Sequence, residues 1–209
     1  DGNDRVTCSS LGALSGPTPF TVSAWVKVDN GYAADAVVVQ QRATNGYNGQ
    51  YRLYVTAAGK IGFYVYGNSV QQFNFAGTTS INDGQWHHIA GVRDASGNAY
   101  VYLDGVQNGS VTGTTVCDLS GSIDIGIGCD IRDSNRYFHG SIDDVRIYGR
   151  DLSVAEIGNI RNLAPVFANS SIVGNSATED TAYSGTINGT ASDSDLGDSV
   201  TYGKVSGPA

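Results

Sequence analysis

The stretch Tyr51–Tyr66, YRLYVTAAGKIGFYVY, alternates apolar and polar side chains on both sides of a short glycine-containing segment. Alternation with a period of two on either side of a turn is typical of a β-hairpin with one buried face. A three-residue loop at Ala58–Lys60, with Gly59 left-handed, keeps core-facing residues opposite one another, whereas a two-residue loop would pair core with surface positions. The expected register pairs Val55 with Phe63, Tyr54 with Tyr64 and Arg52 with Tyr66.

The outward face of this hairpin would carry three tyrosines and an arginine. Sugars stack their C–H faces on aromatic rings, while Arg, Asn and Gln side chains hydrogen-bond the hydroxyls. We therefore expect a shallow glycan site, and its arginine would favour an anionic glycan, such as a sulfated or uronic-acid polymer. Cross-strand tyrosines also stabilise sheets without any ligand, so a purely structural patch is the alternative. The expected ligand-binding residues are Arg52, Tyr54, Tyr64 and Tyr66, with Tyr47, Asn68 and Gln72 from nearby loops.

Similar short strands recur along the first 150 residues, separated by turn signals rich in Gly, Asn and Asp. This spacing predicts an all-β, two-sheet antiparallel jelly-roll sandwich. One short C-terminal helix is expected over Leu152–Ile160, because Ser153 and Glu156 have the spacing of a capping box. The other expected strands are Val6–Cys8, Phe20–Val28, Val37–Arg42, Gln85–Arg93, Ala99–Val106, Ser122–Gly128 and Phe138–Tyr148.

The amino-acid composition of the chain changes near residue 162, where aromatic residues become rare and Ser, Thr, Asp and Gly dominate. We interpret Asn162–Ala164 as a linker and Pro165 as the start of a new module. The predicted domains are therefore a sandwich over 1–161 and a linker with a partial second β domain over 162–209. The chain contains no methionine, which we take as the mark of a piece of a larger chain with neighbouring domains.

Composition narrows the classes of partner. A formal net charge of −8 argues against nucleic acid, because phosphate binding needs a basic patch. No apolar run is long enough for membrane insertion. The three cysteines, Cys8, Cys117 and Cys129, form no CxxC pair, which argues against zinc. A Cys117–Cys129 disulfide stays open for an exported protein, and pairing depends on a Cα separation that sequence does not give.

Catalysis is not expected. Jelly-roll glycosidases need two carboxylates at a defined separation, and the only glutamates are Glu156 and Glu179. His87 and His88 are adjacent on a strand and point to opposite faces, so they cannot chelate one metal together. Trp25 is expected to be a framework residue, with a glycan platform as the alternative. A lyase that uses Tyr, His and Arg remains a third possibility.

Five segments resemble the laminin-G-like jelly-roll family of the concanavalin-A-like superfamily. They are DGNDRV, FTVSAWVKV, DGQWHHIAGVRD, AYVYLDGV and, most specifically, RYFHGSIDDVRIYGRDLSVAEI, within Asp1 to about Ile160. The tail from NLAPVF onward resembles the first half of a bacterial cadherin/Ig-like repeat. The resemblance implies two antiparallel sheets, often a structural Ca²⁺, and frequent glycan or protein binding by modules attached to larger secreted proteins.

The resemblance also suggests where calcium would bind. The segment DGND looks like the family's opening turn, and the Asp143–Asp144 pair lies in its closing strand, which in a jelly roll is commonly a neighbour of the first. Asp144 should point away on the strand. Asp130–Asp133 is a rival acidic loop, and ordinary turn or capping roles are the alternative. The expected metal ligands are Asp1, Gly2, Asp4 and Asp143.

Together these features favour a non-catalytic, secreted or cell-surface carbohydrate-binding module. It would target a larger protein to a polysaccharide or glycoconjugate and hold a structural calcium ion. The alternative is an adhesin or structural protein-interaction module without glycan binding. A last polar loop, with Arg132, Asn135, Arg136 and Tyr137, is either a functional loop or a solvated connection, and we favour the connection.

Overall fold

The computed structural model describes residues 4–9, 14, 16–43, 49–67, 69–113, 116–120, 123–131, 136–161, 166–167 and 191–192. The chain divides into two compact units, Asp1–Arg161 and Asn162–Ala209. In the second unit the described residues form an antiparallel pair of short strands, β12 (Val166–Phe167) and β13 (Ala191–Ser192). The expected cadherin/Ig-like repeat falls mostly outside the described residues.

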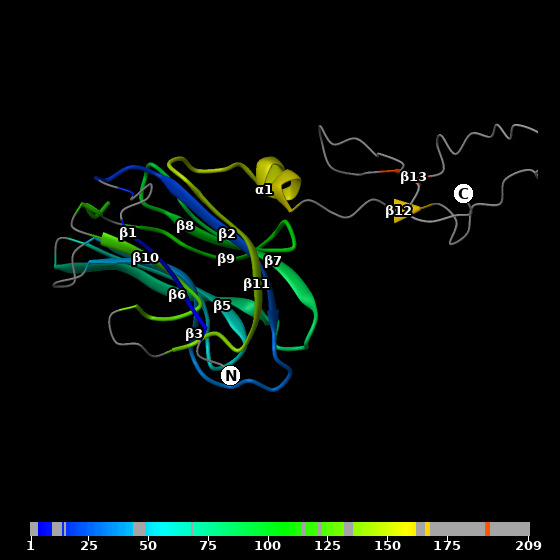
Figure 1. Cartoon of the computed structure of the whole chain (residues 1–209). Coiled ribbons are helices and arrows are strands. Elements are labelled where there is room, and N and C mark those ends of the chain that lie inside the picture. Colours follow the sequence, from blue (N-terminus) through cyan, green and yellow to red (C-terminus); the bar gives the residue numbers. More distant parts are fainter. Residues whose placement is uncertain are drawn as a thin grey trace, which may run out of the picture. The chain divides into compact units, whose positions relative to one another are not determined.

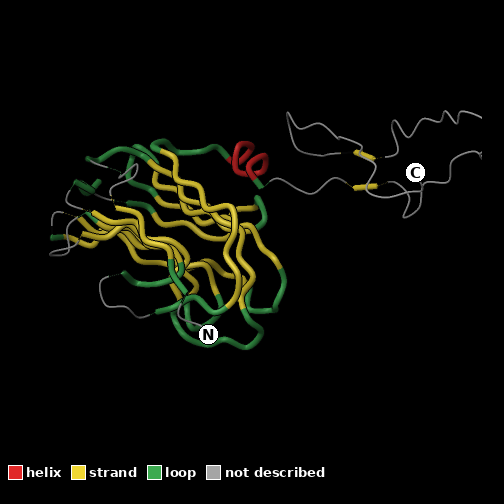
Figure 2. The backbone as a smooth tube through the Cα atoms, in the orientation of Figure 1, coloured by secondary structure: helices red, strands yellow, loops and turns green. Residues whose placement is uncertain are grey.

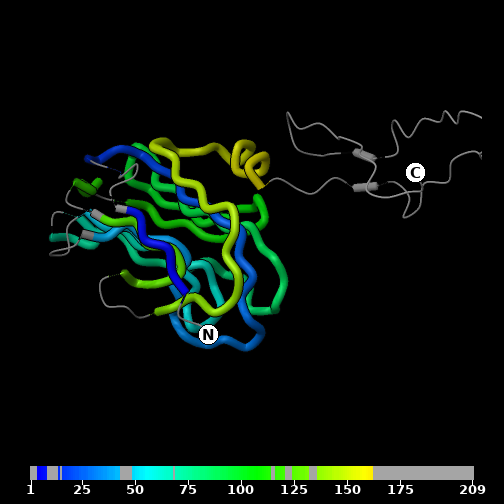
Figure 3. The backbone as a smooth tube through the Cα atoms, viewed as in Figure 1, coloured from blue at the N-terminus to red at the C-terminus, as the bar shows by residue number. Residues whose placement is uncertain are grey.

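The first unit is a sandwich of two antiparallel sheets (Figure 1). One sheet has the order β1 (Val6–Ser9), β10 (Ile123–Ile127), β3 (Ala36–Ala43), β4 (Gln50–Val55), β5 (Lys60–Gly67) and β6 (Val70–Ser80). The other has the order β11 (Gly140–Tyr148), β2 (Phe20–Val28), β7 (Trp86–Arg93), β8 (Ala99–Leu103) and β9 (Val106–Val111). Figure 2 shows these strands as two layers, and Figure 3 shows the N-terminal β1 beside β10, far away in sequence. The predicted all-β sandwich is confirmed.

The core forms where the apolar faces of the alternating strands meet. Phe20 and Val22 of one sheet and Leu53 and Phe63 of the other are fully buried in a single cluster. The rings of Phe20 and Phe63 meet edge to face with centroids 5.8 Å apart. Burial of each such side chain stabilises the fold by about 1.5–3 kcal/mol, so the hydrophobic alternation in the sequence is what holds the two sheets together.

The helix α1 (Val154–Ile160) has the capping box that the sequence predicts. The Ser153 hydroxyl accepts a hydrogen bond from the Glu156 backbone, and the Glu156 carboxylate accepts one from the Ser153 backbone at 2.8 Å. Ile157 is fully buried in a second cluster with Leu152 and three side chains of the five-stranded sheet, Ala90, Val92 and Tyr102. The helix therefore covers the outer face of that sheet.

Two strands differ from expectation. Residues Ala99–Val106, expected as one strand, turn at Asp104–Gly105, where both residues have positive φ (49° and 81°) and join β8 to β9. Asp-Gly is a strong hairpin signal, since this turn needs left-handed residues. Strand β6 was not expected at all, because its run of Gln, Asn and Thr conceals a short alternation in which Phe73 faces the core.

In the Tyr51–Tyr66 hairpin the buried and outward faces are as expected, but the strand register differs from the expected one. Its loop is Ala57–Gly59, one residue earlier than expected, with Gly59 at φ 72°. Thr56 closes the loop, because its hydroxyl accepts a hydrogen bond from the Lys60 backbone at 3.1 Å. The pairs are thus Val55 with Ile61, Leu53 with Phe63 and Arg52 with Tyr64. A shift of two residues preserves alternation, so the pattern alone could not detect it.

The three cysteines lie in the described residues and are free thiols. The Cys117–Cys129 disulfide left open by the sequence is therefore not formed. Cys117 instead lies beside the buried Arg93, whose guanidinium donates a hydrogen bond to the Cys117 carbonyl at 3.1 Å. Within the described part of the chain, none of the helices has the length and apolar character needed to cross a membrane.

Candidate functional site

The outer face of the six-stranded sheet carries a row of polar and aromatic side chains. Strand pairing places Gln40 of β3 opposite Arg52 of β4, Arg52 opposite Tyr64 of β5, and Tyr64 opposite Asn74 of β6. These residues alternate with core residues such as Leu53 and therefore point away from the core. One register row thus crosses four strands and presents a continuous surface.

Arg52 is held between two tyrosine rings. Its guanidinium carbon lies 4.7 Å from the Tyr54 ring centroid and 5.2 Å from that of Tyr64, within cation–π range. Tyr54 lies flat over Gly62, where a Cβ atom would meet the ring at 2.3 Å, and its hydroxyl donates to Asn74 Oδ1 at 2.8 Å. With only 7% of its surface exposed, Tyr54 supports Arg52 more than it offers a surface for stacking.

Tyr64 and Tyr66 present the aromatic surface beside this arginine. Their rings are nearly parallel, at 13°, with centroids 6.4 Å apart. The Tyr64 hydroxyl accepts a hydrogen bond from Gln50 Nε2 at 3.3 Å, which orients the ring. Both residues are partly exposed, so they form a short aromatic ladder that a ligand can reach.

The segment after β10 folds back over the same face. The Ile131 side chain occupies the space above Gly126, where a Cβ atom would meet it at 2.1 Å. The segment is fixed to β3 by two backbone hydrogen bonds, Gly128 N to Val38 O at 3.0 Å and Val37 N to Arg136 O at 2.9 Å. It therefore brings Asp130 and Arg136 to the row of side chains on β3 and β4.

Asp130 is fully buried under this segment and joins three arginines. Its carboxylate forms an ion pair with Arg42, accepts a hydrogen bond from Gln40 at 3.4 Å, and lies 3.4 Å from Arg136. Arg52 is farther away, at 3.9 Å. Burial, followed by the charge of Arg136, lowers the pKa of Arg52, but an arginine stays protonated in proteins. Among the described residues the printed ion pairs join three arginines to one carboxylate, and Asp124 of β10 lies opposite Arg42 in the strand register.

A polar cavity of about 280 Å³ opens at this cluster. This volume lies just below the range of about 300–1,000 Å³ typical of small-ligand sites, so it has room for about one sugar ring. The arginine guanidinium groups and the amides of Gln40 and Gln50 supply hydrogen-bond donors at its wall. Its lining residues are Gln40, Arg42, Gln50, Tyr51, Arg52, Tyr64 and Arg136.

The structure brings together four of the seven expected ligand-binding residues: Arg52, Tyr54, Tyr64 and Tyr66. Gln72 is not with them, because its side chain bonds the Gly97 carbonyl at 3.3 Å and accepts from Arg93. Tyr47 and Asn68 fall outside the described residues.

Sequence reasoning missed the other half of this cavity. Arg136 was interpreted as part of a solvated connection, yet it lines the cavity with Arg42. Asp130 was considered only as part of a rival acidic calcium loop, and it is instead the buried partner of arginines. One signal was available, since Gln40-Gln41-Arg42 interrupts an otherwise apolar strand, and such buried polar residues demand partners.

Of the expected calcium ligands, Asp4 and Asp143 lie in the described residues, next to β1 and on β11. Strand β1 pairs with β10 and β11 pairs with β2, so the first and last strands lie in different sheets. Asp143 Oδ1 accepts the Asp144 backbone N–H at 2.8 Å, which is an ordinary capping role. Asp1 and Gly2 fall outside the described residues, and those described include no group of three or more His, Cys, Asp or Glu suited to a metal. The calcium site therefore remains a prediction, and the described residues include only Asp4 and Asp143 of its expected ligands.

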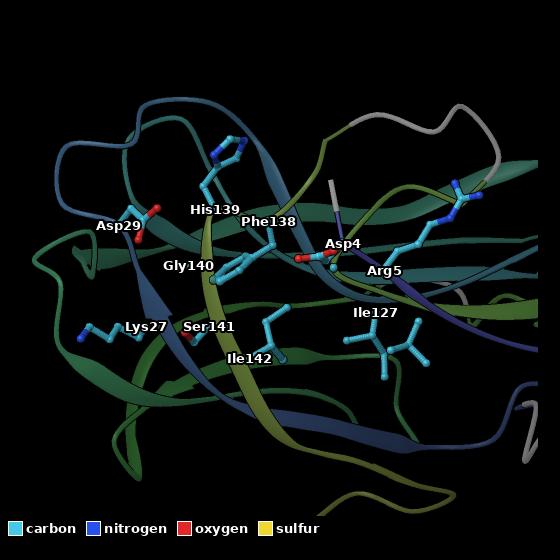
Figure 4. A pocket seen from close by; sticks show the side chains of 12 residues that line it. Asp4, Arg5, Lys27, Asp29, Ile127, Phe138, His139, Gly140, Ser141 and Ile142 are labelled. Atoms are coloured by element: carbon cyan, nitrogen blue, oxygen red, sulfur yellow. The ribbon is translucent and has the colours of Figure 1, made fainter. Parts of the chain in front are cut away.

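Asp4 lines a second, larger cavity of about 570 Å³ at the open side of the sandwich, between β1 and β11 (Figure 4). The apolar part of its wall is formed by Ile127, Phe138 and Ile142. Arg5 and Lys27 lie on opposite sides of the cavity in this view. The positive charges of these two side chains are balanced by the carboxylates of Asp4 and Asp29, which also line the cavity. The polar groups do not converge, so we place the candidate site at the arginine cavity.

The remaining candidates have structural roles. Trp25 is half-buried on the outer face of the five-stranded sheet and donates from Nε1 to the Arg161 carbonyl at 2.8 Å. His87 contacts Asp83 and Asp104 at the sheet end, whereas His88 is buried against the Trp25 ring. The two histidines therefore do not share a site, as the alternation predicts.

The fold and this outward site define a lectin-like sandwich, and the chain belongs to the concanavalin A-like lectin/glucanase superfamily. The model of a laminin-G-type family of that description matches residues 1–158. The match ends before the tail, so the cadherin/Ig-like repeat remains a prediction. No match was found among curated proteins.

Solved structures with the same fold are distant in sequence. The chain is similar to the CBM40 of the Ruminococcus gnavus IT-sialidase bound to α2,3-sialyllactose, with 14% identity, a TM-score of 0.59, and coverage of 73% of this chain and 96% of that one. It is also similar to the SAP-like pentraxin of Limulus polyphemus, with 15% identity and a TM-score of 0.55. This match covers 77% of this chain and 82% of the pentraxin. The chain is also similar to the NanB sialidase of Streptococcus pneumoniae, with 19% identity and a TM-score of 0.60. This match covers 75% of this chain and 26% of the sialidase.

Proposed function

We propose that this chain is a non-catalytic carbohydrate-binding module of an extracellular protein. The observation that carries the proposal is the ladder of Tyr64 and Tyr66 beside the arginine-lined cavity. Parallel aromatic rings offer a stacking surface for sugar C–H faces, and the adjoining guanidinium and amide groups offer hydrogen bonds to hydroxyls. Each of these features lies on a rigid strand or on a segment bonded to one, so the site is preorganised.

The comparisons support this function through the fold. The superfamily includes lectins, and one similar structure is a carbohydrate-binding module in complex with a trisaccharide. Glycoside hydrolysis requires a pair of carboxylates, whereas Asp130, the carboxylate that contacts the arginines of the cavity, is already engaged in ion pairs. Binding without turnover is the chemistry that this arrangement supports.

A glycan-array screen with the whole chain, with and without EDTA, tests the proposal. Tyr64→Ala should lower the affinity for a bound glycan by about two- to tenfold, since an aromatic contact contributes about 0.5–1.5 kcal/mol. The matched control is Tyr100→Ala, a tyrosine on β8 of the other sheet. Binding should persist in EDTA, because the carboxylates described at this site form no metal cluster.

The outcome that opposes the proposal is equally definite. Glycan binding that is unchanged in Tyr64→Ala would show that the ligand does not bind at this site. A well-folded sample that binds no glycan would contradict the proposed function. The adhesin or spacer interpretation would then be the better description of the module.

A further inference from the structure

The charges around the arginine cavity differ in sign from those of the molecule as a whole. The chain has a formal net charge of −8, yet three arginines meet at one place, Arg42, Arg52 and Arg136. Asp130 contacts all three, and Asp124 lies opposite Arg42 on β10, so three arginines face two carboxylates among the described residues. A surplus of positive charge inside a polar cavity, on a molecule that is negative overall, indicates that the site is built to receive an anion.

The three arginines differ in how fully the protein already engages them. Arg42 is paired with the buried Asp130 carboxylate. Arg52 has only 15% of its side chain exposed, lies 3.9 Å from that carboxylate, and its Nε has no hydrogen-bond partner. Its two neighbouring rings contribute cation–π attraction but accept no strong hydrogen bond. The Nε of Arg52 is therefore a buried donor without an acceptor, and its only printed ion pair is a long one, an arrangement that is costly in the absence of a ligand.

Arg136 supplies the second donor from the rim. Its side chain is 42% exposed and touches Asp130 at 3.4 Å, and its backbone has a positive φ of 53°, which is uncommon for a non-glycine residue. The backbone hydrogen bond from Val37 holds this conformation. Arg136 thus faces the cavity from the loop side while Arg52 faces it from the sheet.

We infer that the cavity binds the carboxylate of an acidic sugar, held between Arg52 and Arg136, with the sugar ring against Tyr64. This inference rests on the proposed function and specifies its ligand class. The planar guanidinium fork matches the two oxygens of a carboxylate, and Arg42 is already paired with Asp130. The carboxylate can come from a uronic-acid residue within a polysaccharide or from a terminal sialic-acid residue.

Titration calorimetry on the whole chain tests this inference with matched ligands. The probes are an oligogalacturonate, its uncharged methyl ester, 3′-sialyllactose, lactose and a sulfated galactan oligosaccharide. Binding is expected for at least one carboxylated probe. Its uncharged counterpart should bind about tenfold more weakly or worse, and affinity should fall as salt is added.

The protein variants locate the effect. Arg136→Gln keeps the same Cβ at the positive-φ position and should weaken acidic-sugar binding by about tenfold or more. The matched control is Arg150→Gln, which removes one equal charge from an exposed arginine paired with Glu156 near the helix and should leave affinity unchanged. Arg52→Gln, checked for folding by circular dichroism, should weaken binding in the same way.

The possible failures separate the inference from the function it rests on. Equal binding of an acidic probe and its uncharged counterpart, with Tyr64 still required, overturns the carboxylate site but leaves the carbohydrate-binding module. Binding of the sulfated probe alone also overturns it. Absence of binding to every probe, from a folded sample, overturns the carboxylate site, and silence of the wider glycan array would remove the proposed function as well.

Discussion

Asp130 shows at the scale of one residue how a buried charge shapes a site. An isolated buried carboxylate is costly, and ion pairs inside a protein rarely stabilise it more than an apolar replacement would. Asp130 is fully buried yet lies beside three arginines. Its effect is geometric: it fixes Arg42 and the root of the loop that carries Arg136, so that the remaining charges face the cavity.

His88 carries a prediction about stability and pH. It is buried against the Trp25 ring, with centroids 5.7 Å apart. Burial lowers the pKa of His88 to about 4; Asp104 and Asp144 oppose this shift, and Arg146 and Arg161 add to it. The unfolded chain, with a pKa of about 6.5, binds more protons between these values, so the free energy of unfolding should fall by roughly 3 kcal/mol as the pH drops through this window.

Urea denaturation at about pH 7 and about pH 4.5 measures that slope. His88→Gln should flatten it, because the group that takes up the proton on unfolding is gone. The control is His139→Gln, a histidine stacked on Tyr32, which should keep the slope. A variant without His88 that retains the full pH dependence would assign the effect to other groups.

At the scale of elements, the β4–β5 pair depends on a glycine beneath a ring. A Cβ atom at Gly62 would lie 2.3 Å from the Tyr54 ring, so Gly62→Ala should lift Tyr54 and remove one of the rings that hold Arg52. We expect a loss of about 1–3 kcal/mol in the free energy of unfolding and weaker glycan binding.

The matched substitution is Gly149→Ala, where no atom lies within 4 Å of the added Cβ. Its effect on stability should stay within about 0.5 kcal/mol. Stability and glycan affinity of Gly62→Ala are measured by urea denaturation and calorimetry. If neither changes, the position of the Tyr54 ring over Gly62 contributes neither to stability nor to binding.

The same hairpin shows what the sequence can and cannot reveal. Alternation correctly predicts that Arg52, Tyr64 and Tyr66 face away from Leu53 and Phe63, because side-chain direction has a period of two. It cannot distinguish registers that differ by two residues. In the observed register the Thr56 hydroxyl accepts a hydrogen bond from the Lys60 backbone. Local pattern therefore predicts the faces of a strand, whereas its register also depends on contacts within the turn.

The cavity combines parts that are distant in sequence. Arg42 and Asp130 are 88 positions apart, and the chain between them crosses both sheets. Nothing in the local pattern near Arg136 distinguishes a solvated loop from one that folds over β3. The aromatic half of the site could be predicted from one hairpin, but the charged half depends on strand order, which alternation does not encode.

At the scale of the whole molecule, the two sides of the sandwich are closed differently. On one side β6 and β9 are joined by Asn108, whose Oδ1 accepts from the Thr78 backbone at 2.9 Å and whose amide donates to Thr79 Oγ1 at 2.8 Å. On the other side the cavity between β1 and β11 keeps the sheet edges apart. The contact between the sheets on that side comes from the segment between β10 and β11, where Phe138 N donates to the Gly128 carbonyl at 2.8 Å.

The first unit should fold without the second. A chain that ends at Arg161 keeps the hydrogen bond from Trp25 to the Arg161 carbonyl and should unfold at the same temperature as the full chain. A chain that ends at Asp151 loses α1 and exposes Ala90, Val92 and Tyr102, so its midpoint should fall, since each large side chain removed from that cluster contributes about 1.5–3 kcal/mol.

Thermal unfolding followed by circular dichroism compares these three chains. A lower midpoint for the chain that ends at Arg161 would mean that residues 162–209 stabilise the sandwich directly. An unchanged midpoint for the chain that ends at Asp151 would mean that α1 is an accessory rather than a cover for the sheet.

The irregular β11 has a consequence for self-association. An exposed edge strand offers unpaired backbone groups to another molecule and is a common route to aggregation. In β11 the register breaks between Asp143 and Arg146, and Asp144 takes a positive φ of 48°. Such a bulge, with two adjacent carboxylates, makes a poor template for a further strand. The bulge and the two carboxylates at Asp143 and Asp144 thus make the β11 edge unsuited to pairing with the edge of a second copy of the protein.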